Sequence, residues 1–241
     1  MLDPYGAGAQ YYDLLHGKER AAQAREIIKP LAGWVRHGVL DLGAGTGIAV
    51  VEAAALIPRV PITVVEPSRA MRTVLFNKLA ADSKLRSRTT VLPHAAEQLE
   101  LDGVADLAIC LDTSPSFPPP YRPDIWEKLH RALVPGGALV LDLPELGEPV
   151  VVPGTEVGRV EIGQTTLVGY CRGEPAGQRQ WWEFRYTLQD ADGELIADDS
   201  VEHYTWPVEP RELQHEVEAV GFVAKDTRDV AGSRILVLRR Q

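Results

Sequence analysis

Cysteine is nearly absent from this sequence, since only Cys110 and Cys171 occur in 241 residues. A disulfide framework needs several paired cysteines and a zinc site needs closely spaced ligands, so neither is expected. The six histidines show no spacing typical of metal ligands either. We therefore expect a protein without a metal in a reducing compartment, the cytoplasm.

Long hydrophobic runs and an excess of basic charge are also missing. No apolar run approaches the roughly 18 residues of a membrane span, and the first 20 residues lack the basic start and apolar core of a signal peptide. The formal net charge is −9, whereas nucleic-acid binding depends on Lys and Arg that neutralise phosphates. A small molecule is therefore a better candidate partner than a membrane or a nucleic acid.

Lysine and asparagine are scarce as well, with Asn77 the only asparagine in the chain. This bias suggests a GC-rich genome and fits a role in secondary metabolism. The remaining composition, 45% hydrophobic and 24% charged, is ordinary for a globular protein whose length allows a substantial core.

Apolar segments alternate with helical patterns along most of the chain. We expect helices at 19–32, 48–57, 68–82 and 124–134, and strands at 39–42, 61–67, 89–93, 105–112 and 137–144. A helix at 209–222 and strands at 223–229 and 234–240 resume this rhythm. Nearly continuous apolar strands that alternate with helices predict an α/β fold, a Rossmann-like, doubly wound and mostly parallel sheet built from residues 1–146 and 207–241.

Residues 147–206 have a different pattern. Three β-rich segments, at 156–170, 178–188 and 194–206, are separated by turn compositions, and Trp182, Phe184, Tyr186 and Leu188 alternate as one buried strand face should. We expect an antiparallel β insertion after the fifth strand. Its aromatic content is compatible with a homodimer interface.

The segment VLDLGAGTG, residues 39–47, places a glycine loop between a strand and a helix. A dinucleotide fingerprint G-x-G-x-x-G would need a glycine at Ile48 or Val50, and no Gly-Lys-Ser/Thr follows for a P-loop. What remains is D-x-G-x-G-x-G from Asp41 to Gly47, with Glu66 at the end of the second strand. The loop therefore matches neither the dinucleotide fingerprint nor the P-loop.

The motif from Asp41 to Gly47, followed by Glu66, resembles motif I and the following acidic position of class I methyltransferases that use S-adenosylmethionine. The stretches LVPGGALVLDL and ELQHEVEAVGF are also similar to late segments of that family. The resemblance implies that the loop main chain approaches the amino acid part of the donor and that Glu66 accepts both ribose hydroxyls. The donor-binding residues it implies are Tyr11, Asp41, Gly43, Ala44, Gly45, Gly47, Glu66, Pro67, Met71, Ala95, Ala96 and Leu111.

The family's third acidic position falls at LPHAAEQLE, where His94 stands instead. Contact with adenine is therefore expected from the main chain near Ala95 and Ala96. Glu97 is either a ligand or a charge at a helix start.

The segment AQYYDLLHG, residues 9–17, resembles the N-terminal region of small-molecule N-methyltransferases, including glycine N-methyltransferase-like and amino-sugar dimethyltransferase-like enzymes. There the segment folds over the donor, and an antiparallel insertion helps to form the acceptor pocket or a dimer. Tyr11 and Tyr12 would accordingly cover the sulfonium, or else pack a helix. The candidates for catalysis are Tyr12, Asp112 and His203, with His203 as proton acceptor because its pKa lies near the working pH before any perturbation.

The predicted function is in-line methyl transfer from S-adenosylmethionine to nitrogen or oxygen of a small molecule. A NAD-type oxidoreductase and a catalytically silent donor-binding module are the alternatives.

Overall fold

The computed structural model describes residues 3–241, which form a seven-stranded sheet flanked by helices and a separate four-stranded sheet. The helices are α1 (Ala9–Ile28), α2 (Ile48–Leu56), α3 (Arg69–Ala81), α4 (Ser83–Arg86), α5 (Arg122–Ala132) and α6 (Pro210–Ala219), with short 3₁₀ turns at Ala96–Gln98, Ser114–Ser116 and Pro119–Tyr121. Within the described residues, the helices are too short or too polar to cross a bilayer.

The larger sheet has the strand order β10-β11-β5-β4-β1-β2-β3. Its strands are β1 (Val39–Leu42), β2 (Ile62–Val65), β3 (Thr89–Leu92), β4 (Ala105–Cys110), β5 (Leu133–Asp142), β10 (Phe222–Val230) and β11 (Ser233–Arg240). The first five strands pair in parallel, and β11 pairs antiparallel with β5 and β10. The predicted α/β fold with a mostly parallel sheet is thereby confirmed.

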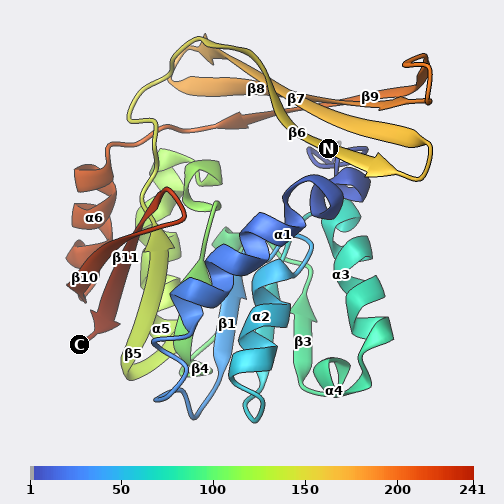
Figure 1. Cartoon of the computed structure of the whole chain (residues 1–241). Helices are drawn as coiled ribbons and strands as arrows, with labels where there is room; N and C mark the ends of the chain where they lie inside the picture. The colour runs from blue at the N-terminus through green and yellow to red at the C-terminus, as the bar shows by residue number, and fades with distance from the viewer. Residues whose placement is uncertain (1–2) are drawn as a thin grey trace.

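Helices cover both faces of this sheet, because its strands are apolar on both sides. One hydrophobic cluster includes Ile28, Ala53 and Leu75 from α1, α2 and α3, and the other includes Trp126 and Leu213 from α5 and α6. Figure 1 shows these helices in front of and behind the strands. The strand order reverses direction between β1 and β4, which is where open α/β sheets leave a crevice beyond the carboxyl ends of their strands.

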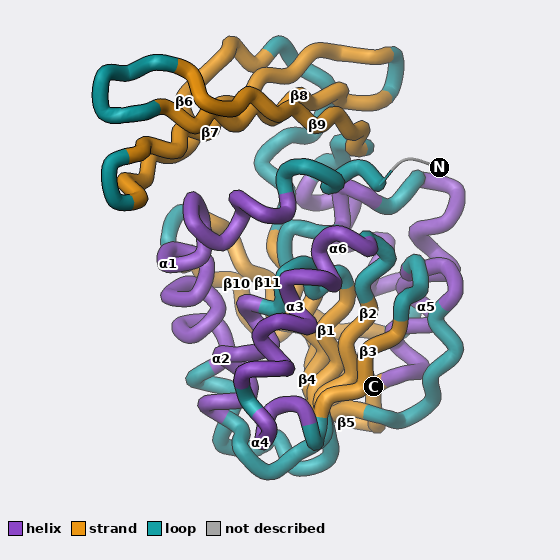
Figure 2. The backbone as a smooth tube through the Cα atoms, turned by 90° about the vertical axis from the view of Figure 1, so that its right-hand side faces the viewer, coloured by secondary structure: helices purple, strands orange, loops and turns teal. Residues whose placement is uncertain are grey.

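The four-stranded sheet is antiparallel, in the order β6-β7-β8-β9. Its strands are β6 (Val152–Ile162), β7 (Thr165–Ala176), β8 (Arg179–Gln189) and β9 (Leu195–Thr205). Figures 1 and 2 show it lying across the end of the main sheet where the N-terminal segment is found. Gly169 packs against Leu15 of α1 so closely that a Cβ there would lie 2.8 Å from Leu15 Cδ1, and the Trp206 N–H donates to the Pro115 carbonyl at 2.7 Å.

Some predicted boundaries were wrong. The helix predicted at 19–32 begins ten residues earlier, at Ala9, and ends at Ile28, because the proline at position 30 has no N–H to continue the helical hydrogen bonds. The β segment predicted at 156–170 is a hairpin that turns at Gly163, where φ is +61°. Strand β5 starts at Leu133, ahead of the Pro-Gly-Gly sequence, and its pairing with β4 shifts register there.

Candidate active site

The glycine loop between β1 and α2 has left-handed backbone at Gly43, Gly45 and Gly47, with φ of +76°, +56° and +82°. Two of these glycines are also required by packing. A Cβ on Gly43 would lie 2.3 Å from Thr113 Oγ1, and one on Gly47 would lie 2.4 Å from Leu75 Cδ1. A Cβ on Gly45 would meet nothing within 4 Å. The loop therefore leaves open space at Gly45, which borders a cavity.

Glu66 follows β2 and is 4% exposed. Its Oε2 accepts the Gly45 N–H at 2.7 Å and its Oε1 accepts the Ser68 N–H at 2.6 Å. Burial raises the pKa of Glu66, and these two hydrogen bonds oppose that shift. Since each carboxylate oxygen has two lone pairs, the fixed side chain keeps acceptor capacity for a ligand. Glu66 thus joins the glycine loop to the start of α3, where Ser68 caps the helix by accepting the Met71 N–H.

Asp41 is the last but one residue of β1 and is 3% exposed. Its Oδ2 has no hydrogen-bond partner among the described residues. Burial, together with the negative charge of Glu66, raises the pKa of Asp41 to about 7. A buried carboxyl oxygen without a partner is costly. This atom therefore marks a position where a donor group of a ligand would be stabilised.

Stability should depend on pH through Asp41. Its folded pKa lies above its unfolded value of 3.8. The free energy of unfolding should therefore fall as the pH rises from about 4 to about 7, because the unfolded chain ionises there more readily than the folded one. We expect Asp41→Asn to gain stability relative to the wild type between pH 5 and pH 8, measured by urea unfolding. The control is Asp106→Asn, because the Asp106 carboxylate is buried but accepts the N–H groups of Arg36, His37 and Gly38. A difference between Asp41→Asn and the wild type that stays constant across this range would show that Asp41 is ionised throughout.

Asp112 follows β4 and has left-handed backbone, with φ of +53° in a residue other than glycine. Its N–H donates to Asp142 Oδ1 at 2.9 Å, and its carboxylate pairs with Arg20 of α1 at 2.7 Å. Burial raises the pKa of Asp142 to about 7, with the negative charge of Asp112 adding to the effect. The side chains of Arg20 and Asp112 are 36% and 44% exposed. Asp142 thus holds the strained main chain of Asp112. The Asp112 side chain is paired with Arg20 but remains accessible to solvent.

The N-terminal segment forms another wall of the site. Asp3 accepts hydrogen bonds from Ser68 Oγ and the Ala70 N–H at the start of α3. The phenol of Tyr5 is buried, and burial raises its pKa, as does the nearby charge of Glu66. Further along α1, Asp13 accepts a hydrogen bond from Thr46 Oγ1 at 2.6 Å and pairs with Lys78 at 2.7 Å. The segment and α1 are therefore fixed to both the glycine loop and α3.

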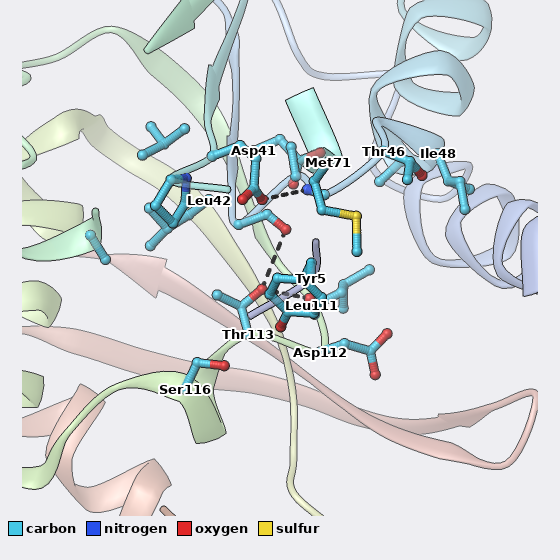
Figure 3. A pocket seen from close by; sticks show the side chains of 18 of the residues that line it. Tyr5, Asp41, Leu42, Thr46, Ile48, Met71, Leu111, Asp112, Thr113 and Ser116 are labelled. Atoms are coloured by element: carbon cyan, nitrogen blue, oxygen red, sulfur yellow. Dashed lines mark hydrogen bonds between the residues drawn. The ribbon is translucent and has the colours of Figure 1, made fainter. Parts of the chain in front are cut away.

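These elements enclose one cavity at the carboxyl ends of β1, β2 and β4 (Figure 3). Most residues predicted from the sequence border it: Tyr12, Asp41, Gly43, Ala44, Gly45, Glu66, Pro67, Met71, Ala95, Ala96, Leu111 and Asp112. Glu97 also lines it. The structure brings these residues together from segments far apart in the sequence. Their roles as ligands stay predictions.

Three other predicted residues do not line this cavity. Tyr11 donates a hydrogen bond to Asp199 at 2.6 Å and stacks on Tyr186, so its side chain is directed to the antiparallel sheet. Gly47 packs against Leu75 behind the loop. His203 lies on β9 of the antiparallel sheet.

His203 lies on β9, stacked on Phe184 at 5.3 Å and 5.5 Å from the ring of Tyr5. Burial lowers its pKa to about 4, and its Nδ1 has no hydrogen-bond partner among the described residues. A neutral imidazole with such a pKa is a weak base at neutral pH. Since Tyr5 lines the cavity and contacts this ring, His203 is placed one side chain away from it, and its catalytic role stays a prediction.

Sequence reasoning missed several cavity residues, among them Tyr5, Arg20, Thr113 and Ser116. Thr113 and Ser116 belong to the loop after the fourth strand, where acceptors are expected in such sheets, so their position was a usable signal. Tyr5 lies in a turn-rich segment, and Arg20 is one of several charges on a helix. Neither carries a local pattern that would single it out.

The residues present fit S-adenosylmethionine. Open space at Gly45, lone pairs of Glu66 and the unpartnered Oδ2 of Asp41 face or border the same cavity. Within residues 3–241, His, Cys, Asp and Glu side chains form no group of three placed to hold a metal ion. Both cysteines are free and buried.

Comparison with known proteins agrees with this geometry. A family described as a methyltransferase domain matches residues 39–137. No curated protein matches the chain.

Solved structures show the same fold over nearly the whole chain. DesVI from Streptomyces venezuelae has 17% identity and a TM-score of 0.77, with 96% of each chain covered. An amino pentose methyltransferase from Micromonospora echinaspora, involved in calicheamicin biosynthesis and solved with S-adenosylmethionine, has 19% identity and a TM-score of 0.73, over 93% of this chain and 92% of that one. The sugar N-methyltransferase KedS8 from Streptoalloteichus sp has 23% identity and a TM-score of 0.71, over 93% and 89%. The family match identifies residues 39–137 as a methyltransferase domain, and the solved structures show that the fold extends over nearly the whole chain.

Proposed function

We propose that this enzyme methylates an amine nitrogen of a small, sugar-like molecule. The observation that carries the proposal is the cavity that joins the glycine loop, Glu66 and Asp41 to the loop after β4, beneath an antiparallel sheet. Structures of similar shape include an amino pentose methyltransferase and a sugar N-methyltransferase. The comparisons give no support to an oxidoreductase or a silent binding module.

The order of the strands indicates how the donor would be oriented in the cavity. Glu66 follows β2 and Ala95 and Ala96 follow β3, so the ribose and adenine would lie over this side of the sheet. The methionine part would then lie over β1 and β4, beside Arg20 and Asp112. Among the described residues that line the cavity, Arg20 is the only one with a permanent positive charge. Arg20 would therefore hold the carboxylate of the donor, and Asp41 Oδ2 would accept from its ammonium group.

Methyl transfer demands little proton chemistry from the protein. S-adenosylmethionine supplies a methyl group on a sulfonium, which is already activated for displacement. The residues of this chain would align the acceptor nitrogen, keep water out and hold the polar groups in place. Tyr5, Tyr12 and Phe117 give the cavity aromatic walls. Transfer to an amine needs no base as strong as an alkoxide reaction would, which agrees with the low pKa of His203.

We propose that the antiparallel sheet, residues 147–206, completes the acceptor end of the cavity. On its inner face His203 lies next to Tyr5, and Phe184 is stacked on His203. Other side chains of the sheet form exposed cross-strand pairs, including Arg172 with Glu183 and Arg185 with Asp198. Such pairs favour a solvated face over an apolar dimer interface. The homodimer and the cytoplasmic location stay predictions.

Calorimetric titration tests the donor site directly. We expect S-adenosylhomocysteine to bind the wild-type protein and NADH not to bind, because the loop lacks the spacing for a dinucleotide pyrophosphate. Incubation with labelled S-adenosylmethionine and amino sugars, with the matching neutral sugars as controls, tests the acceptor. Binding of NADH in place of S-adenosylhomocysteine, or label transfer to hydroxyl groups alone, would contradict the proposal.

A further inference from the structure

The pair of Arg20 and Asp112 occupies the acceptor side of the donor cavity. Both residues line that cavity, and their charged groups lie 2.7 Å apart. Each side chain remains more than a third exposed, so the pair is held weakly and its ions can change partners at small cost. The proposed donor brings a carboxylate to the only permanent cation of the cavity wall among the described residues. That carboxylate and Asp112 would compete for the same guanidinium.

The main chain at Asp112 does not depend on Arg20. The Asp142 carboxylate holds the Asp112 N–H, and the left-handed backbone there directs the residue away from the ordinary course of a strand end. Loss of Arg20 as a partner would therefore leave the Asp112 side chain in place with its charge uncompensated. A free carboxylate in the wall of the cavity attracts a cationic amine.

We propose that binding of the donor moves Arg20 from Asp112 to the carboxylate of the donor and so opens Asp112 as the binding group for an amine acceptor. The acceptor binds as an ammonium ion and gives one proton to the Asp112 carboxylate, and the neutral nitrogen then takes the methyl group as its bond to sulfur breaks. This inference rests on the proposed function and adds to it an order of binding, donor before acceptor. Before the donor binds, Arg20 neutralises Asp112 and the acceptor gains little there. After it binds, the acceptor meets an unpaired carboxylate, and the two affinities are linked reciprocally.

The exchange predicts that removal of the charge of Asp112 strengthens donor binding. In calorimetric titrations, Asp112→Asn should bind S-adenosylhomocysteine about two- to fivefold more tightly than the wild type, because Arg20 no longer has a competing partner. Asparagine also tolerates left-handed backbone, so the loop is retained. Arg20→Gln should weaken S-adenosylhomocysteine by about tenfold, and Asp112→Asn should have no further effect in that background.

Methylthioadenosine is the matched control ligand, because it has the adenosine and sulfur but no amino acid part. Its affinity should be the same in the wild type and all three variants. If Asp112→Asn weakens S-adenosylhomocysteine, Asp112 contacts the ammonium group of the donor and the exchange is wrong. An unchanged affinity, or a gain that persists with Arg20→Gln, also overturns it. Failure of the wild type to bind S-adenosylhomocysteine would instead refute the proposed function.

The second half of the inference concerns the acceptor. Methyl 3-amino-3-deoxyglucoside should bind the protein saturated with S-adenosylhomocysteine at least several-fold more tightly than the free protein, whereas methyl glucoside should not. Asp112→Asn should remove this difference. Equal affinity with and without S-adenosylhomocysteine, or no binding of the amino glycoside, would overturn this half.

Discussion

Replacement of Glu66 by glutamine is expected to weaken binding of S-adenosylhomocysteine by about 1 to 3 kcal/mol, or roughly 5- to 150-fold. The Glu66 carboxylate accepts main-chain N–H groups on both oxygens, from Gly45 and from Ser68. The amide of glutamine offers only one acceptor oxygen, so its NH₂ group must face a donor on one side. The variant would lose orientation of the loop as well as the acceptor for the ribose hydroxyls.

Asp106→Asn is the matched control for this variant. Asp106 is also buried and also accepts main-chain N–H groups. Its partners, however, are residues 36–38, which lie just before β1 at the end of the strands opposite the cavity. This control should lower the free energy of unfolding without changing the affinity for S-adenosylhomocysteine. Calorimetry and urea unfolding together separate the two effects. Equal affinities of Glu66→Gln and the wild type would show that the site map is wrong.

Two glycines of the loop should lose different amounts of stability on replacement by alanine. Gly47→Ala should cost about 2 to 4 kcal/mol of unfolding free energy, because left-handed backbone disfavours a Cβ and the new methyl would overlap Leu75 Cδ1, 2.4 Å away. Gly45→Ala should cost only about 1 to 2 kcal/mol, since its Cβ meets open space.

Donor binding separates the same pair of variants. Gly45 borders the cavity and its N–H bonds Glu66, so Gly45→Ala should weaken S-adenosylhomocysteine more than its small loss of stability suggests. Gly47→Ala, studied at a temperature where it is folded, should bind more nearly as the wild type does. Urea unfolding and calorimetry measure both quantities. Equal losses of stability in the two variants would contradict the packing described for Leu75.

Local sequence patterns predicted most of the fold. The strands near Val39 and Ala105 are mostly apolar, and their alternation with helices favours a parallel sheet, which buries them on both faces. The helix start at Ser68 was visible as a capping residue. The ends of α1 were missed because its first half, Ala9 onward, was interpreted through a resemblance to a covering segment, while the effect of a following proline was not applied.

The site residues also fall into those that the sequence could predict and those that it could not. Asp41, the glycine loop and Glu66 were predictable because strand ends that follow one another in the chain meet at one edge of a parallel sheet. Both Tyr11 and Tyr12 were predicted at the site, but neighbouring positions on a helix point in different directions, and only the packed structure shows that Tyr12 lines the cavity while Tyr11 bonds Asp199. His203 was placed on an insertion strand correctly, but its burial against Phe184 and the low pKa that follows were not visible.

The sequence by itself determined the class of the fold and the unsuitability of the loop for a dinucleotide, and its resemblance to a known family indicated the donor. Periodicity, glycine spacing and turn chemistry act over a few residues, so they can be read along the chain. Only the tertiary structure decided that Tyr5 and Glu66 line one cavity, that Arg20 pairs with Asp112, and that a separate sheet lies over the site. Those contacts join segments whose approach depends on how whole helices and sheets pack, and no short stretch of sequence encodes that.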